Sequence, residues 1–254
     1  MKKLEVLFPD FCHLYAEGWN ADYLAKCSPE IEVIETLNHE VPAFVRGDVD
    51  MVYLGASSET KQELILERLR PYKARIEELI ERGTVFLVTG NAPEIFGTEI
   101  RDGGRVIPAL GLFPFHAVRT PGLSRHNSQF IGEFEGMTVL GHKSQFSFAY
   151  PDEEGASDID PAFIRLEQGT GMNPGSMLEG VRRNNFFATY SLGPFLILNP
   201  DFDKYLLRLL GLPEPQFYHL PLLLAADGRR LSKRDGDDSL ENLRSRYTAA
   251  EIIG

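Results

Sequence analysis

The chain has few thiols and little positive charge. Only Cys12 and Cys27 are cysteines, and the apolar run after Lys3 is too short for a signal peptide. These two facts favour reduced thiols in the cytoplasm over a disulfide framework. Lys and Arg number 26 against 37 Asp and Glu, which gives a formal net charge of -11. This balance argues against nucleic-acid or anionic-membrane binding, because phosphate neutralisation needs clustered Lys and Arg.

Long apolar runs and low-complexity segments are also missing. No apolar stretch approaches 18 residues, so we expect no membrane span. The 16 prolines and 23 glycines are dispersed, which argues against a disordered segment. The 254 residues are 43% hydrophobic, enough for one large domain or for a domain with an appendage.

Strand patterns alternate with helix patterns in the first part of the chain. We expect helix over 59–82, in which Pro71 begins a second helix or kinks the first, and which Gly83 ends. Residues 138–150 look rich in strand, and 181–198 suggest two strands around a turn at 191–193. The other expected elements are strands at 4–8, 31–37, 50–55 and 84–89 and a helix at 13–26. This order predicts a three-layer α/β fold in which helices flank a mostly parallel sheet.

The strand at 84–89 runs into the glycine-containing turn Gly90-Asn91-Ala92-Pro93-Glu94-Ile95-Phe96-Gly97. A strand–turn–helix corner of this kind exposes the nucleophile of many enzymes. The segment resembles the corner of class I glutamine amidotransferases, whose pattern is Cys-Gly-Gly-x-Gln-x-x-Gly. Aligned on Gly97, the family's cysteine falls on Gly90 and its glutamine on Glu94.

Two further segments resemble the same family. Thr189-Tyr190-Ser191-Leu192-Gly193-Pro194 is similar to the family's Thr-Tyr-x-His-Gly-Pro, which places the catalytic histidine at Leu192. Residues 141–147, with Gln145, align with the family's Gly-Phe-Glu-Asn-His-Gly-Gly. The order of elements up to residue 210 is similar to the glutaminase subunit of lipid II isoglutaminyl synthase, in the cobyric-acid-synthase-like branch. The resemblance implies a flavodoxin-like domain over 1–210.

Glutamine hydrolysis needs a thiolate to attack the amide and a histidine to carry protons. Gly90 and Leu192 supply neither, and loss of such a group typically costs thousands-fold or more in rate. We therefore expect a pseudoenzyme whose pocket binds a small ligand or a partner, with no cofactor and no metal. The resemblance implies a Mur-ligase-like partner in cell-wall metabolism. The expected vestigial pocket comprises Gly90, Asn91, Glu94, Gln145, Tyr190 and Leu192.

An amidotransferase with an unrecognised nucleophile is an alternative. Thr89 lies beside Gly90, and Cys12 has His13 as its neighbour. A strand threonine is usually structural, however, and adjacent side chains often point apart. We expect the remaining histidines to be ordinary surface residues, because no pair has metal-ligand spacing. These are His39, His116, His126 and His142.

The last part of the chain, 211–254, has a different character. Asp227-Gly228-Arg229-Arg230-Leu231-Ser232-Lys233-Arg234 resembles the Lys-Met-Ser-Lys-Ser loop of glutamyl-tRNA and glutamyl-queuosine tRNA(Asp) synthetases. The resemblance implies that Lys233, with Ser232 and Arg234 beside it, would meet the phosphates of ATP. No His-Ile-Gly-His-type motif precedes it, so we expect no amino-acid activation. A fragment of such a ligase is a second alternative.

We expect this tail to hold a strand at 220–224, an exposed loop at 227–238 and a helix from Ser239. The apolar side chains of the strand need a covering surface, either the main domain or a second copy of the chain. With the second of these covering surfaces, the chain would form a homo-oligomer through this segment.

Overall fold

The computed structural model describes residues 1–120, 125–156, 158–216, 224, 228–229 and 248. The chain divides into two compact units, Met1–Pro215 and Gln216–Gly254. The strand, loop and helix expected in the tail, and Ser232, Lys233 and Arg234, lie outside the described residues except for isolated positions. No helix in the described part of the chain is long and apolar enough to cross a membrane.

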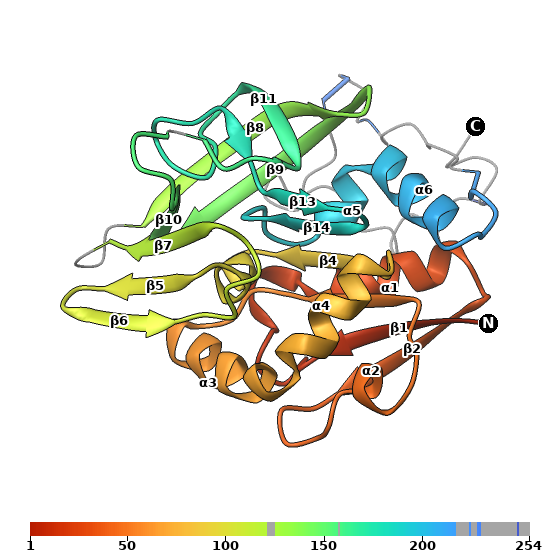
Figure 1. Cartoon of the computed structure of the whole chain (residues 1–254). Coiled ribbons are helices and arrows are strands. Elements are labelled where there is room, and N and C mark those ends of the chain that lie inside the picture. The colour runs from red at the N-terminus through yellow and green to blue at the C-terminus, as the bar shows by residue number, and fades with distance from the viewer. Residues whose placement is uncertain (121–124, 157, 217–223, 225–227, 230–247, 249–254) are drawn as a thin grey trace. The chain divides into compact units, whose positions relative to one another are not determined.

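A six-stranded sheet in the order β13-β14-β4-β3-β1-β2 forms the centre of the first unit (Figure 1). All neighbouring pairs in it are parallel except the hairpin of β13 with β14. The strands are β1 (Lys2–Leu7), β2 (Ile31–Thr36), β3 (Met51–Leu54), β4 (Val85–Thr89), β13 (Val181–Arg183) and β14 (Phe186–Thr189).

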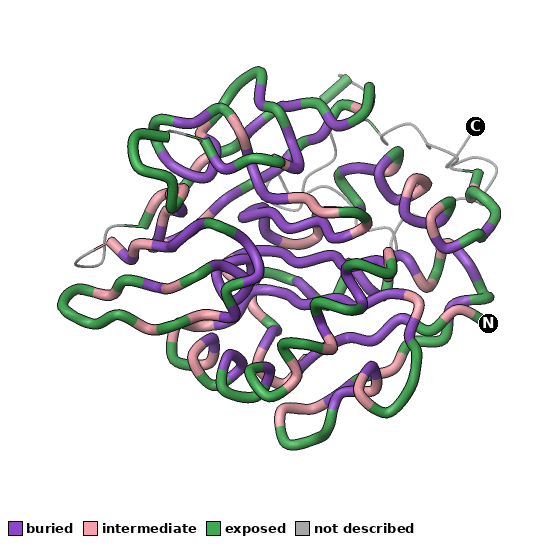
Figure 2. The backbone as a smooth tube through the Cα atoms, viewed as in Figure 1, coloured by how far each residue is buried: buried purple, intermediate pink, exposed green. Residues whose placement is uncertain are grey.

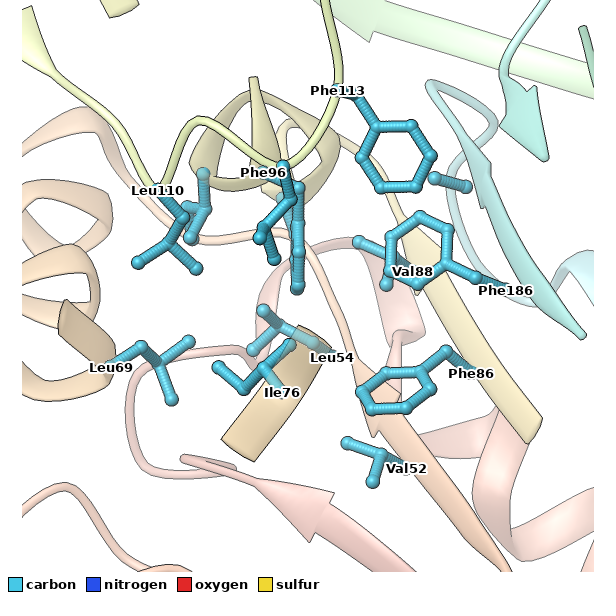
Figure 3. Packing of buried hydrophobic residues seen from close by; sticks show 14 of the residues in the cluster. Val52, Leu54, Leu69, Ile76, Phe86, Val88, Phe96, Leu110, Phe113 and Phe186 are labelled. Carbon is cyan, nitrogen blue, oxygen red and sulfur yellow. The ribbon is translucent and has the colours of Figure 1, made fainter. Parts of the chain in front are cut away.

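Every residue of β3, β4 and β14 is buried, as expected for central strands that are covered on both faces. Alternate residues pack on opposite sides of the sheet. Phe86 and Phe186 point into one hydrophobic cluster, with ring centroids 5.6 Å apart (Figure 3). Leu87 and Phe187 belong to the other cluster. The buried positions along these strands are visible in Figure 2.

Helices cover both faces of the sheet and complete three layers. α3 (Glu59–Leu69) and α4 (Lys73–Glu81) contribute buried residues to the first cluster. α1 (Gly18–Cys27) and α6 (Pro200–Leu209) contribute to the second. The three-layer α/β fold predicted from the sequence is therefore confirmed. The short helices are α2 (Ala43–Arg46), α5 (Phe195–Leu198), η1 (Leu14–Ala16), η2 (Arg70–Tyr72) and η3 (Ala92–Phe96).

Local signals in the sequence explain several boundaries. The expected helix over 59–82 is interrupted at Arg70–Tyr72, where Pro71 removes a backbone donor. Gly83 ends α4 with a φ of +82°, a conformation that glycine adopts without steric cost. The helix expected over 13–26 starts only at Gly18, because Tyr15 and Ala16 adopt positive φ angles of 53° and 60°.

Two four-stranded sheets were not anticipated. Their orders are β10-β7-β5-β6 and β12-β11-β8-β9, and most of their pairs are antiparallel. The strand-rich segment 138–150 corresponds to β9 and β10. The strands are β5 (Glu99–Asp102), β6 (Arg105–Pro108), β7 (Phe115–Arg119), β8 (His126–Phe134), β9 (Met137–Gln145), β10 (Ser147–Pro151), β11 (Ile164–Gln168) and β12 (Leu178–Glu179).

The turn predicted at 191–193 is wrong. β13 and β14 are joined at Asn184 and Asn185, and Asn184 has a φ of 53°. Asparagine tolerates this left-handed conformation better than other non-glycine residues. Residues 191–193 instead follow β14 and lead to α5.

Candidate functional site

Gly90 forms a tight corner between β4 and η3. Its φ is +66°, and its N–H donates to the carbonyl oxygen of Ser191 at 3.0 Å. A Cβ at Gly90 would lie 2.4 Å from the Cβ of Ala56 and 3.4 Å from Cδ2 of Leu192. Gly90 and Leu192 are therefore within side-chain reach, as the alignment of the two motifs predicted. Ala56, Gly90 and Leu192 follow β3, β4 and β14, so they meet at the carboxyl edge of the parallel sheet.

A cavity of about 210 Å³ opens at this corner. All six residues of the expected pocket line it: Gly90, Asn91, Glu94, Gln145, Tyr190 and Leu192. The other lining residues were not among the expected six, although Ser144, Phe146 and Ser147 lie in the segment 141–147 that resembles the family. The other lining residues are Leu14, Tyr15, Ala56, Ser57, Ser58, Glu59, Arg119, Arg125, Ser144, Phe146 and Ser147.

Three of the lining residues, Ala56, Gly90 and Leu192, are in close contact with one another, as the distances from Gly90 show. The side chain of the neighbouring Asn91 is occupied by hydrogen bonds. Its side-chain oxygen accepts from the N–H of Ser57 at 3.0 Å, and its amide nitrogen donates to the carbonyl of Ser57 at 2.8 Å. The two segments that carry Gly90 and Ala56 are thus held together by a reciprocal pair of hydrogen bonds.

A network of polar side chains is organised around Glu94, which also lines the cavity. This carboxylate is fully buried and accepts hydrogen bonds from Tyr190 Oη at 3.1 Å and Gln62 Nε2 at 3.0 Å. Ser147 Oγ donates to the same group. Burial raises the pKa of Glu94, and the hydrogen bonds oppose this rise only in part. The family's glutamine position thus holds an acid that is anchored by three side chains.

Arg119, on β7, continues this network. It is 7% exposed and donates to Glu63 at 3.0 Å, Asp102 at 2.9 Å and Gln62 Oε1 at 2.9 Å. Its Nε has no hydrogen-bond partner among the described residues. Gln145 donates to the carbonyl of Ser147 at 2.5 Å, but its own Oε1 also has no partner in the described structure. Both atoms are buried, and both residues belong to the lining of the cavity.

Arg125 lies nearer the solvent. Its guanidinium is 4.6 Å from the ring centroid of Phe146 and 5.8 Å from that of Tyr15. Both distances suit a cation–π contact. All three residues line the cavity, so they bring a positive charge and two aromatic faces to its wall.

A buried acid that the sequence did not reveal lies behind the corner. Glu17 Oε2 accepts from Thr89 Oγ1 and Tyr53 Oη, both at 2.5 Å, and Oε1 accepts from the N–H of Gly193 at 2.8 Å. Burial raises the pKa of Glu17. Gly55 and Gly193 leave the space for this residue, since a Cβ on either would lie 2.9 Å from Glu17. Glu17 thus links Tyr53 of β3 and Thr89 of β4 to Gly193, which lies in the segment after β14.

The two alternative nucleophiles are poorly placed for attack. Thr89 is fully buried, and its hydroxyl is bound to Glu17 rather than directed into the cavity. Cys12 is buried and lines a separate cavity of about 90 Å³. Burial raises the pKa of its thiol, which keeps it protonated and weakly nucleophilic.

The histidines do not gather at the site. Among the described residues, no histidine and no cysteine lines the 210 Å³ cavity. His116 pairs with Asp152 at 2.9 Å, and His142 contributes only its backbone carbonyl, to the N–H of Leu192 at 2.8 Å. No group of three or more His, Cys, Asp or Glu residues suited to a metal ion occurs within the described ranges.

The two parts of the chain are similar to different known proteins. No protein family model matches it. A crystal structure of a glutamine amidotransferase superposes on 82% of this chain and 99% of its own, with a TM-score of 0.53 and 19% sequence identity. At this identity the likeness shows the fold alone, and it agrees with the flavodoxin-like class I fold that the sequence predicted.

Curated sequence relatives match the C-terminal part of the chain. Glutamate–tRNA ligase of Synechococcus sp. (strain CC9902) is 54% identical over 57 residues, which are 22% of this chain and 12% of that protein. Glutamyl-Q tRNA(Asp) synthetase of Symbiobacterium thermophilum is 50% identical over 48 residues, 19% of this chain and 15% of that protein. The chain therefore spans a small fraction of the length of these curated relatives.

Proposed function

We propose that this chain is a non-catalytic binding protein built on a glutamine amidotransferase-like fold. The observation that carries the proposal is the contact of Gly90 with Ala56 and Leu192 at the head of the cavity. In the family that the sequence resembles, this corner would hold a cysteine and a histidine. Here it holds a hydrogen atom and an isobutyl group, neither of which attacks an amide or carries a proton.

The residues around Gly90 leave no space for a side chain at this position. A Cβ at this position would approach the Cβ of Ala56 to 2.4 Å, far inside van der Waals contact. Reinstating the nucleophile thus requires a change at Ala56 as well. The lining of the cavity keeps an ordered polar network around Glu94 and Arg119. A site that has lost its reacting groups but keeps its polar wall is suited to binding without turnover.

A glutaminase assay tests this proposal. The protein is incubated with L-glutamine, and ammonia release is followed by a coupled assay, with an active glutaminase as positive control. We expect no ammonia above the protein-free background. Release that is abolished by Thr89→Val or Cys12→Ser would favour an unrecognised nucleophile and would overturn the proposal.

We propose a Mur-ligase-like enzyme of cell-wall metabolism as the partner of this chain. We also propose that the chain is located in the cytoplasm, where the free thiols of Cys12 and Cys27 would remain reduced. The support is the sequence resemblance described above. Size-exclusion chromatography of this chain with a Mur-ligase-like protein encoded beside it tests the proposal. Co-elution is the expected result, and separate elution at micromolar concentrations would contradict it.

A second candidate function concerns the C-terminal segment, since it is 54% identical to part of a glutamate–tRNA ligase. In this alternative the segment is the phosphate-binding loop of an ATP-dependent ligase, with Ser232, Lys233 and Arg234 in contact with the phosphates. Pyrophosphate exchange with glutamate and ATP discriminates between the two. Exchange that is lost in Lys233→Ala would establish the alternative, and background exchange would leave the binding protein as the better account.

A further inference from the structure

The outer face of the sheet formed by β12, β11, β8 and β9 has an apolar centre (Figure 1). Ile131 on β8 and Leu140 on β9 are 39% and 40% exposed, and they lie directly opposite each other in the register of the two strands. The buried residues of both strands occupy the alternate positions, so Ile131 and Leu140 share the face that is turned away from the hydrophobic core. Side chains in opposite positions are neighbours, so these two form one aliphatic patch.

The positions around this patch on β8 and β9 are mostly uncharged. Gln129 lies opposite His142, and Thr138 is the outward residue two positions before Leu140. All three are exposed, and none is an Asp, Glu, Lys or Arg. Charged groups are costly to bury, and the cores of protein interfaces are depleted of them. The centre of this face therefore has the composition of an interface core.

The edge of β9 beside the patch is closed to strand pairing. Asn199 Oδ1 accepts from the N–H of Leu140 at 2.7 Å, and Asn199 Nδ2 donates to the carbonyl oxygen of Leu140 at 2.8 Å. The side-chain amide thus occupies both backbone groups that a further strand would need at this position. A partner must pack on the face of the sheet rather than on its edge. Leu198, which precedes Asn199, is 47% exposed and adds a third aliphatic side chain close to this edge.

We propose that two copies of this chain associate through this face, with Ile131 and Leu140 at the centre of a symmetric dimer. A two-fold contact uses the same surface on both copies, so that surface must be complementary to itself. An uncharged aliphatic patch meets this requirement, because it gains from burial against a second patch of the same kind.

The charges at the rim of the patch favour a second copy over a strongly charged partner. Arg165 on β11 is exposed and has no hydrogen-bond or ion-pair partner among the described residues. Glu133, which lies opposite it on β8, is an exposed acid of the same rim. An acidic partner would face Glu133 and a basic partner would face an unpaired guanidinium. A second copy offers both signs of charge.

Size-exclusion chromatography with multi-angle light scattering tests this inference on the full chain over a concentration series. One chain has a mass of 28.6 kDa, and we expect the mean mass to rise toward twice this value at micromolar concentrations. Leu140→Glu should raise the dissociation constant of the dimer by at least about a hundredfold, because each copy would bury a carboxylate without a partner. The matched control Val106→Glu, at a 59% exposed position on β6, should leave it unchanged.

Cross-linking locates the contact. Residues beside a two-fold axis lie near their own counterparts, so a short bis-maleimide should join Leu140→Cys to a second copy. Val106→Cys and the wild type, which has the free thiols of Cys12 and Cys27, are the controls and should stay unlinked. The melting temperature of each variant checks its fold. Ile131→Glu and Ile131→Cys take the place of the variants at Leu140 if those do not fold.

A wild-type chain that stays monomeric would assign the face to a different partner and would overturn the inference. A dimer that persists in Leu140→Glu, or that is not cross-linked through Leu140→Cys, would also overturn it, because the contact would then lie elsewhere. None of these results bears on the 210 Å³ cavity, so this inference and the proposed binding function can fail separately.

Discussion

The Cβ of Ala56 lies 2.4 Å from the position that a Cβ on Gly90 would occupy. Real Cβ atoms do not approach one another so closely, so these two residues of neighbouring strands are matched in size. Gly90 also needs its positive φ of 66° to make the corner. A side chain at position 90 would thus conflict with the packing of the sheet edge.

Gly90→Ala should destabilise the protein through two effects. A positive φ costs a side chain about 1–2 kcal/mol, and overpacking typically costs about 1–3 kcal/mol more. The control Gly103→Ala shares a positive φ of 59° but has open space around it, so it should show the first effect alone. Urea unfolding measures both. Ala56→Gly in the Gly90→Ala background should restore the overpacking part, and equal losses for Gly90→Ala and Gly103→Ala would contradict the steric account.

The sequence predicted this corner because its signals are local. Pro71, Gly83 and Gly90 each fix the backbone within a few residues, so helix and strand boundaries near them were readable. Glu17 and Arg119 could not be found this way. Glu17 reaches the corner from a segment 72 residues before Thr89, and Arg119 joins through Glu63 and Gln62, more than 50 residues away. Only the folded chain brings such residues together.

The antiparallel sheets escaped prediction for a related reason. In β8, Phe130, Gly132 and Phe134 are buried at alternate positions, but the small Gly132 weakens the apolar pattern. That glycine is required by packing, because a Cβ there would lie 2.6 Å from the carbonyl oxygen of Arg165 on β11. Gly132 therefore makes β8 hard to recognise in the sequence, and the same glycine allows β11 to pack closely against β8.

Stability should fall as the pH rises through the pKa of Asp203. Burial raises the pKa of this carboxyl from 3.8 to about 6 in the folded protein. An acid with a raised folded pKa contributes its stability fully below the unfolded pKa and loses it as the pH rises to the folded value. The loss between about pH 4 and pH 6 should be about 2–3 kcal/mol at most.

Asp203→Asn should flatten this part of the pH profile, as measured by urea unfolding at several pH values. The exposed Asp201 lies on the same first turn of α6, so Asp201→Asn is the matched control and should leave the profile unchanged. An identical slope in wild type and Asp203→Asn would rule out the assignment to this residue.

The buried pair of Lys143 and Glu179 should be necessary for the shape of the cavity. Lys143 Nζ donates to Glu179 Oε2 at 2.8 Å, and Glu179 Oε1 accepts from the N–H of Tyr190 at 2.7 Å. Both charged side chains are fully buried. Lys143→Met leaves the carboxylate without its counter-ion and should cost about 3–5 kcal/mol. Arg101→Met breaks the exposed pair with Glu99 and should cost less than about 1 kcal/mol. Comparable losses in the two variants, measured by chemical denaturation, would contradict the role of burial.

Restoring the catalytic pair should require three changes rather than two. Gly90→Cys with Leu192→His supplies a thiol and an imidazole, but the cysteine Cβ still meets Ala56. We expect the double variant to be destabilised and inactive, and the addition of Ala56→Gly to restore the part of the stability that is lost to overpacking. Any glutaminase activity that appears should appear only in the triple variant. Activity in the double variant equal to that in the triple variant would show that Ala56 does not block the site.

The central claim is that no activated nucleophile lines the cavity, and intact-mass spectrometry tests it most directly. The wild-type protein is incubated with a glutamine analogue that carries an electrophilic diazoketone in place of the amide, beside an active glutaminase as control. The account predicts an adduct on the control enzyme and an unchanged mass for this chain. An adduct that maps to Thr89, Cys12 or a residue of the cavity wall would contradict it.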